Sequence, residues 1–136
     1  MAIEGISYTA GGNISPCRFV AIESGTDYTA IQCDASKVPV GVCGKGKETY
    51  NGTYHATDGR PVLVHGLGQT ALLELGGVVS AGMFLKSDAD GKGVEASLTA
   101  SSHQDIGARA LMSGFSGEFV EVRVELMSGR QGNSAT

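Results

Sequence analysis

The sequence carries one pattern of β-like runs and glycines twice, and this repeat constrains the fold more than any single motif. The first copy opens with Ile14–Val20 and the second with Val79–Leu85, an offset of 79 − 14 = 65 residues. Further along, Gly41 and Gly107 lie in matching surroundings at an offset of 107 − 41 = 66, so the register slips by one residue. The repeat is therefore approximate.

Each copy closes with a glycine followed by a β-rich run. These runs are Gly59–Val64 and Gly117–Val124, at an offset of 117 − 59 = 58, which predicts a shorter connecting loop in the second copy. We interpret the repeat as two similar β lobes that close against each other. A duplication of this kind is a scaffold, and it contains no pattern that indicates a reaction centre.

The composition supports an all-β chain. Glycine accounts for 21 of the 136 residues, proline for only 3, and aromatic residues for 6%. Frequent glycine between short apolar runs suits tight turns between strands, and the length suits one domain. We predict a small antiparallel β-barrel or sandwich with a duplicated strand pattern, in which residues 8–127 form a single β domain.

The last strand has the clearest pattern. Apolar and polar positions alternate towards the end of the chain, which predicts a strand with one buried and one solvated face. The residues expected on the buried face are Val120, Val122, Val124 and Leu126.

Shorter runs predict further strands. The Asn-Gly pair within Thr49–Tyr54 predicts a β-hairpin. Weak helical patterns predict single turns at Ala35–Lys37 and Ala96–Gln104. The other expected strands are Cys17–Ile22, Tyr28–Cys33, Val38–Cys43, Pro61–His65, Thr70–Leu75, Met83–Lys86, Val94–Glu95 and Arg109–Met112.

The two ends lack a β pattern. Residues 1–7 precede the first expected strand, and residues 128–136 are polar, so we predict an N-terminal arm and a flexible C-terminal tail. The arm carries Ile3 and Ile6, for which the sequence offers no core partner.

Charge and hydropathy argue against several classes of partner. The net charge is −4, and no run of Lys or Arg supplies the basic stripe that nucleic-acid binding requires. No apolar run reaches the ~20 residues of a membrane span, and the N-terminus does not read as a signal peptide. We therefore expect a protein used without export, with Cys17, Cys33 and Cys43 as free, partly buried thiols.

One segment imitates a nucleotide-binding motif. Gly41–Lys47 fits G-x-x-x-x-G-K, the start of a phosphate-binding loop. That loop requires a Ser or Thr next, to hold Mg²⁺, and then a helix whose N-terminus attracts phosphate. Here Glu48 follows, and then the predicted hairpin, so we expect a glycine-rich loop and no nucleotide cofactor.

Asp88–Gly91 resembles a fragment of a calcium loop, but the distal ligands of a full loop are incomplete. Asp and Gly are favoured in β-turns, so we predict a turn without metal. The three histidines His55, His65 and His103 share no spacing typical of metal ligands.

A cluster of polar residues offers the side-chain types of a hydrolytic triad. Such triads are assembled from separate segments on a rigid frame, and no activating partner can be named here. We predict a polar loop, no catalytic residue and no enzymatic activity. The cluster consists of Ser101, Ser102, His103 and Asp105.

The order of these segments resembles the small capsid decoration, or cement, proteins of tailed bacteriophages. Members typically show a P-V-G-V segment, a glycine-led strand and a second V-x-A-G-x-x-L-x-S-D segment, then I-G and G-E-x-V-x-V. Cys17 departs from the pattern, because a glycine is common there, and the Lys45–Asp58 hairpin is longer than usual. The matching residues are Pro39–Val42, Val62–Gly66, Val79–Asp88, Ile106–Ala108 and Gly117–Val122.

The resemblance implies a protein made in the host cytoplasm and located in the virion, on the outer capsid surface. Its partner would be the major capsid protein, whose neighbouring subunits it would hold together, and it would form a homotrimer. No cofactor, nucleic acid or membrane is implied. We expect the arm to contact the shell or a neighbouring subunit through Ala2, Ile3, Glu4, Gly5, Ile6 and Ser7.

A small ligand- or carbohydrate-binding β domain is the alternative. Sugar sites usually present exposed aromatic rings, whereas this chain has no Trp and only 4 Tyr. Tyr50 and Tyr54 in the predicted hairpin form the best candidate platform.

Overall fold

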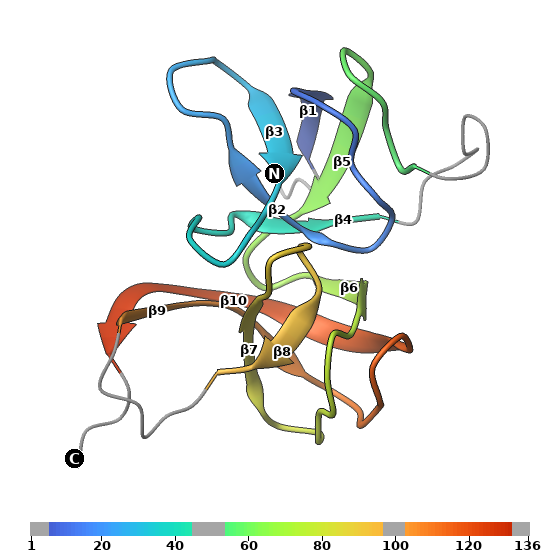
Figure 1. The fold of residues 1–136 in the computed structure, drawn as a ribbon, viewed down its shortest axis with the longest axis vertical. Helices are drawn as coiled ribbons and strands as arrows, with labels where there is room; N and C mark the ends of the chain where they lie inside the picture. The colour runs from blue at the N-terminus through green and yellow to red at the C-terminus, as the bar shows by residue number, and fades with distance from the viewer. Residues whose placement is uncertain (1–5, 45–53, 97–102, 132–136) are drawn as a thin grey trace.

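Ten β-strands form two stacked lobes in the computed structural model, which describes residues 6–44, 54–96 and 103–131 (Figure 1). These ranges contain no helix, so the predicted all-β class is confirmed. The strands are β1 (Ile6–Ala10), β2 (Phe19–Ile22), β3 (Thr29–Gln32), β4 (Gly41–Cys43), β5 (Pro61–His65), β6 (Thr70–Glu74), β7 (Phe84–Ser87), β8 (Gly93–Glu95), β9 (His103–Ala110) and β10 (Phe119–Gln131).

The two lobes share one topology. Lobe one is a closed barrel in the order β1-β3-β2-β4-β5, and lobe two is a sheet in the order β6-β10-β9-β7-β8. If five is added to each strand number, the barrel closes in the order β6-β8-β7-β9-β10-β6. This is the order of the sheet read in the opposite direction. The sheet is open only between β6 and β8, where a single parallel bridge, Leu75 to Gly93, stands in place of the parallel β1–β3 pairing. The predicted duplication is therefore a duplication of a five-stranded β unit.

A recurrent turn precedes two strands in each lobe. A residue in an isolated bridge is followed three positions later by a residue with positive φ, and a strand then begins. The bridges are Ile14 to Ala56 in lobe one and Val79 to Gly114 in lobe two. The left-handed residues are Cys17, Gly59, Gly82 and Gly117, with φ of 56°, 83°, 93° and 89°.

This turn explains the offsets in the sequence. The bridge residues repeat at 79 − 14 = 65 and 114 − 56 = 58, the same two offsets that relate the opening and closing runs. Glycine adopts positive φ without a Cβ clash, which accounts for three of the four positions. Cys17 holds the same conformation as a non-glycine residue, at the position where the resemblance predicts glycine.

The core crosses from one lobe to the other. Successive side chains of a strand point to opposite faces, so β2 directs Val20 into the barrel and Phe19 and Ala21 towards lobe two. The barrel interior holds Ala10, Ile14, Val20, Ala30, Cys43, Ala56, Val62 and Val64. The larger cluster joins Phe19, Ala21, Cys33 and Val42 of lobe one to Leu73, Leu75, Val79, Leu85, Ala108, Ala110, Val120, Val122 and Val124 of lobe two.

The inward face predicted for the last strand is confirmed. Val120, Val122 and Val124 are fully buried, and Leu126 is partly buried against the same cluster. Strand β10 pairs with β6 on one side and β9 on the other, and with β9 it forms a long ribbon that extends beyond the rest of lobe two (Figure 1).

Both predicted ends are shorter than expected. Ile6 and Ser7 belong to β1, where they pair with Val64 and Leu63 of β5, so the arm does not extend to residue 7. At the other end β10 continues to Gln131, so residues 128–131 are strand and not tail. In both cases a distant partner strand holds a polar or weakly patterned segment in extended form, which local propensity cannot indicate.

Two further local predictions are wrong. Strand β9 begins at His103 and not at Arg109, because residues 103–106 pair with the far end of β10, so no helical turn includes Gln104. The helical turn predicted at Ala35–Lys37 is instead a single tight turn outside any helix. In it the N–H of Lys37 donates to the carbonyl of Asp34 at 3.3 Å. The hairpin predicted at residues 49–54 lies almost wholly outside the described residues.

Candidate interaction surfaces

The seam between the lobes is polar as well as apolar. Arg18 lies next to the left-handed Cys17, and its Nη2 forms an ion pair with Oε1 of Glu74 at 3.0 Å. The same guanidinium donates from Nη1 to the carbonyl of Asp90 at 2.8 Å. Gln32 also donates to that carbonyl, at 2.9 Å. One backbone oxygen of lobe two therefore accepts hydrogen bonds from two side chains of lobe one.

The segment Asp88–Gly91 is the β-turn that the sequence predicts, between β7 and β8. The N–H of Gly91 donates to the carbonyl of Asp88 at 3.2 Å. The Asp88 carboxylate accepts the N–H groups of Asp90 and Lys92 at 2.8 and 2.9 Å. This carboxylate is therefore engaged in stabilising the turn that contacts Arg18. Among the described residues, no three His, Cys, Asp or Glu side chains gather as a metal site.

The structure separates the residues of the phosphate-loop match. Gly41 to Cys43 form β4, whose side chains are buried, while residues 45–48 lie outside the described ranges. The thiol of Cys43 donates to the carbonyl of Ser15 at 3.3 Å, and burial raises the pKa of Cys43 to about 12. All three cysteines are free, as the sequence predicts, and they are fully buried where partial burial was expected.

The polar cluster expected in a loop lies partly in a strand. His103 and Asp105 belong to β9, which corrects the loop interpretation, while Ser101 and Ser102 lie outside the described residues. Asp105 lines a hollow of about 240 Å³ where residues 34–38 of lobe one approach β7 and β9. Lys37 and Lys86 line the same hollow, so its charges are mixed.

Two histidines of lobe one stand at the β5 side of the barrel. His55 precedes the bridge residue Ala56, and its Nε2 accepts the N–H of Leu63 at 3.2 Å. Burial lowers the pKa of His55, and His65 nearby acts in the same direction. Of the proposed aromatic platform, Tyr54 is only partly exposed, and Tyr50 lies outside the described residues.

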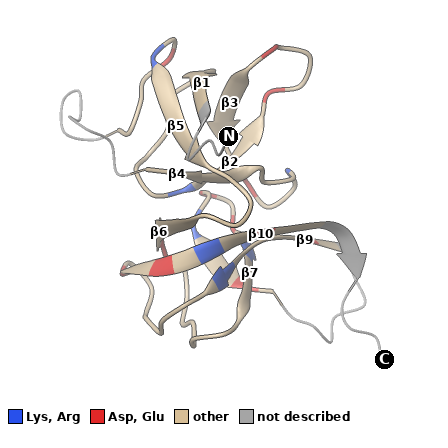
Figure 2. Ribbon diagram, turned by 180° about the vertical axis from the view of Figure 1, so that it is seen from behind, with Lys and Arg blue, Asp and Glu red and all other residues tan. Residues whose placement is uncertain are grey.

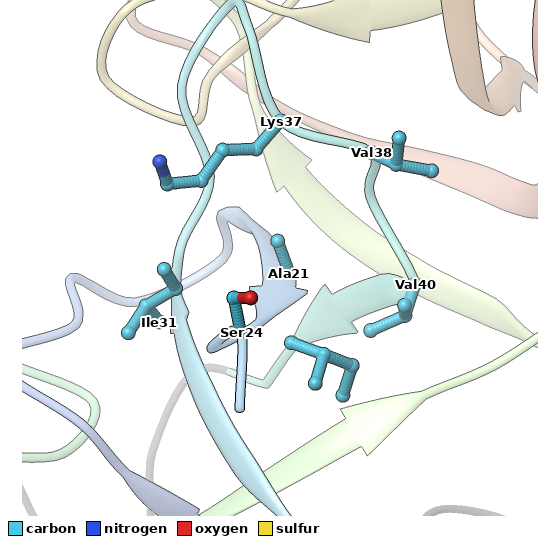
Figure 3. Close-up of a pocket in the computed structure, with 7 residues that line it drawn as sticks. Ala21, Ser24, Ile31, Lys37, Val38 and Val40 are labelled. Atoms are coloured by element: carbon cyan, nitrogen blue, oxygen red, sulfur yellow. The ribbon is translucent and has the colours of Figure 1, made fainter. Parts of the chain in front are cut away.

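A shallow apolar hollow of about 400 Å³ lies on lobe one (Figure 3). Ile22 and Val38 are 41% and 47% exposed, so the hollow is open to solvent. Ligand sites are usually concave and add several convergent polar groups to an apolar lining. The lining here consists of Ala21, Ile22, Ser24, Ile31, Lys37, Val38 and Val40, and it does not resemble such a site.

Exposed apolar side chains gather on two neighbouring connections of lobe two. They belong to the β6–β7 connection, the β9–β10 connection and the first residue of β10 (Figure 1). We call this set the apolar foot: Val78, Leu111, Met112, Phe115 and Phe119, which are 66%, 48%, 45%, 65% and 50% exposed. The sequence analysis missed the foot, because these residues have the same apolar character as core residues.

Comparison with known proteins supports the fold. No family model matches the chain, and no curated protein matches it. Among solved structures, it is similar to the N base of head fiber gp8.5 in bacteriophage phi29, with a TM-score of 0.62. The similarity covers 93% of this chain and 95% of that chain at 17% sequence identity, so it concerns the arrangement of the strands across both lobes.

Within the part of the chain that the structure describes, no helix is long and apolar enough to cross a membrane.

Proposed function

We propose that the protein is a structural component of a phage head, a decoration protein that binds the outer capsid surface and holds neighbouring major capsid protein subunits together. The main observation behind the proposal is the structural similarity to the base of a phage head fiber, which covers 93% of this chain and 95% of that chain. The order of segments in the sequence points independently to head decoration proteins.

The physical basis of stabilisation is preferential binding. A protein that binds the assembled shell and not the separated subunits favours the shell by mass action. Many copies on a symmetric shell add avidity to weak individual contacts. A body whose lobes share one core, with Arg18 and Gln32 fixed on the Asp90 carbonyl, presents its surfaces in a constant geometry. We assign no catalytic step to the chain.

The proposal includes a homotrimer and a contact by the N-terminal arm. Because Ile6 and Ser7 pair with β5, the residues left for this contact are Ala2 to Gly5. Deletion of residues 2–5 should leave the melting temperature unchanged and weaken attachment to heads. Deletion of residues 2–7 would also remove part of β1 and should destabilise lobe one. Full attachment after the shorter deletion would contradict the role of the arm.

The test of the function is binding to heads. Heads purified from the phage that encodes the protein, but lacking it, are mixed with the protein and imaged by electron microscopy. The expected map shows density for both lobes on the outer surface, and the decorated heads retain DNA to a higher temperature. Absence of bound density at saturating protein would refute the proposal. Density of a single copy at isolated sites would refute the trimer alone.

A further inference from the structure

We propose that the apolar foot is the face through which each copy docks onto the shell, against an uncharged, apolar surface of the capsid protein. This inference rests on the proposed function and specifies the contact. The foot consists of five partly exposed apolar side chains on two neighbouring connections of lobe two.

The duplication supplies an internal comparison. At the offsets of 65 and 58, Val78 corresponds to Asn13, Phe115 to Thr57, and Phe119 to Pro61. Lobe one forms the same bridge and the same turns with Asn and Thr at the first two of these positions. The fold therefore does not require apolar side chains there. Exposed apolar patches that the fold does not need mark interaction sites.

The foot is also held in place before any partner binds. Val79 and Gly114 exchange both backbone hydrogen bonds, at 2.9 and 3.0 Å, which fixes the two connections side by side. Ser113 Oγ accepts the N–H of Ala81 at 3.0 Å, and the Glu118 carboxylate accepts the N–H of Phe115 at 2.8 Å. A preorganised surface loses less conformational entropy on binding than a mobile one.

The charge pattern indicates the chemistry of the partner. The two connections, residues 75–83 and 111–118, contain a single charged side chain, Glu118, whose carboxylate accepts the Phe115 N–H. Figure 2 shows neither blue nor red along the lower turns of these connections, whereas β10 itself carries both colours. At the offset of 58, residues 54–60 of lobe one correspond to residues 112–118, where Ser116 takes the place of Asp58 and Glu118 that of Arg60. The five side chains of the foot are uncharged, so they lose no charge hydration on contact with a neutral apolar surface.

The size of the foot favours a repeating shell over a second free copy. Stable protein interfaces use about 20–30 residues on each side, and the foot offers five apolar side chains. Such a patch is too small to hold two free molecules together on its own. On a lattice of identical sites the same small contact is sufficient, because neighbouring copies and further contacts add avidity.

The experiment compares two double variants on purified heads. The foot variant, Val78→Asn/Phe115→Thr, places residues of the lobe-one turns on lobe two; Val78→Asn alone is the milder version. The control variant, Leu67→Asn/Val38→Thr, removes comparable apolar surface elsewhere, since Leu67 is 69% exposed in the β5–β6 turn and Val38 is 47% exposed. The foot variant, its milder version and the control variant should each melt within roughly 2–4 °C of the wild type, because exposed substitutions cost little stability.

We expect the foot variant to need at least about tenfold more protein for half-saturation of heads. The control should stay within about twofold, and wild-type binding should change little between roughly 50 and 500 mM salt. If both variants lost the same affinity for heads, or if the foot variant lost none, the inference would be overturned while the decoration function stands. A foot variant that binds heads normally but loses self-association in ultracentrifugation would identify a subunit interface instead. A wild-type protein that does not bind heads would refute the proposed function and this inference with it.

Discussion

Gly107 of β9 lies against the ring of Phe19 from β2, so that a methyl group at Gly107 would stand 2.5 Å from Cε1 of Phe19. The same methyl group would stand 3.0 Å from Cγ of Pro39. Phe19 is fully buried and belongs to the cluster that the two lobes share. The absence of a side chain at this position of lobe two therefore creates the space into which lobe one inserts its phenylalanine.

Gly107→Ala should therefore destabilise the protein. The ring of Phe19 cannot move freely in a packed core, and overpacking of this kind costs about 1–3 kcal/mol of the free energy of unfolding. Gly77→Ala is the matched control, because a methyl group there would meet Val94 at an ordinary 3.8 Å. Chemical denaturation of both variants checks the prediction; an unchanged midpoint for Gly107→Ala would show that the lobes can separate slightly at no cost.

The sequence predicted the repeat well because the repeat resides in local turn chemistry. The offsets of 65 and 58 follow from turns that need positive φ, and glycine marks three of these four positions directly. Strands with strong alternation, such as β5 and β10, were found for the same local reason.

The features that could not be predicted from the sequence depend on pairing between distant strands and on which side chains are exposed. Strand β1 is set by its pairing with β5, more than 50 positions away (Ile6 with Val64, 64 − 6 = 58), and β9 by its pairing with β10. Phe19 and Phe119 each lie two positions after a residue with positive φ, yet Phe19 is fully buried and Phe119 is 50% exposed. Only the arrangement of the lobes distinguishes them, so the apolar foot was not predictable from residue type.

The recurrent turn predicts a set of backbone effects. Gly59→Ala and Gly117→Ala should each cost about 1–2 kcal/mol, the usual cost of a Cβ in the left-handed region, because φ is 83° and 89° there. No atom lies within 4 Å of the added methyl group at either position, so the loss would report backbone strain alone. Gly66→Ala is the control, with equal space and no positive φ. Equal melting temperatures for all three variants would contradict the strain argument.

The ion pair at the seam should contribute to the union of the lobes. The side chains of Arg18 and Glu74 are only 13% and 17% exposed, and Arg18 also donates to the Asp90 carbonyl. Arg18→Met should lower the free energy of unfolding by about 1–3 kcal/mol, since Glu74 keeps only its longer ion pair with Lys92, at 3.5 Å. Adding Glu74→Leu should restore part of this loss, which a double-mutant cycle by denaturant unfolding measures. Additive losses would show that the pair does not couple.

His55 should make the protein sensitive to mild acid. Its Nε2 accepts the Leu63 N–H, so the folded state favours the neutral ring, and burial lowers its pKa below the ordinary 6.5. Below pH 6.5 the unfolded chain binds a proton that the folded protein does not, so the free energy of unfolding falls with pH until the lowered folded pKa is passed. His55→Gln retains an acceptor without titrating, and its unfolding free energy should be flatter in this window.

Asp34 does not confound that measurement. Hydrogen bonds from Ser36, first from its backbone N–H, lower the pKa of Asp34 below the ordinary 3.8, so its stabilising effect is lost only at more acidic pH. The difference between the wild type and His55→Gln in denaturant unfolding from pH 7.5 to 4.5 therefore reports on His55. If His55→Gln showed the same pH dependence as the wild type over this range, the titration of His55 would not be the cause of acid sensitivity.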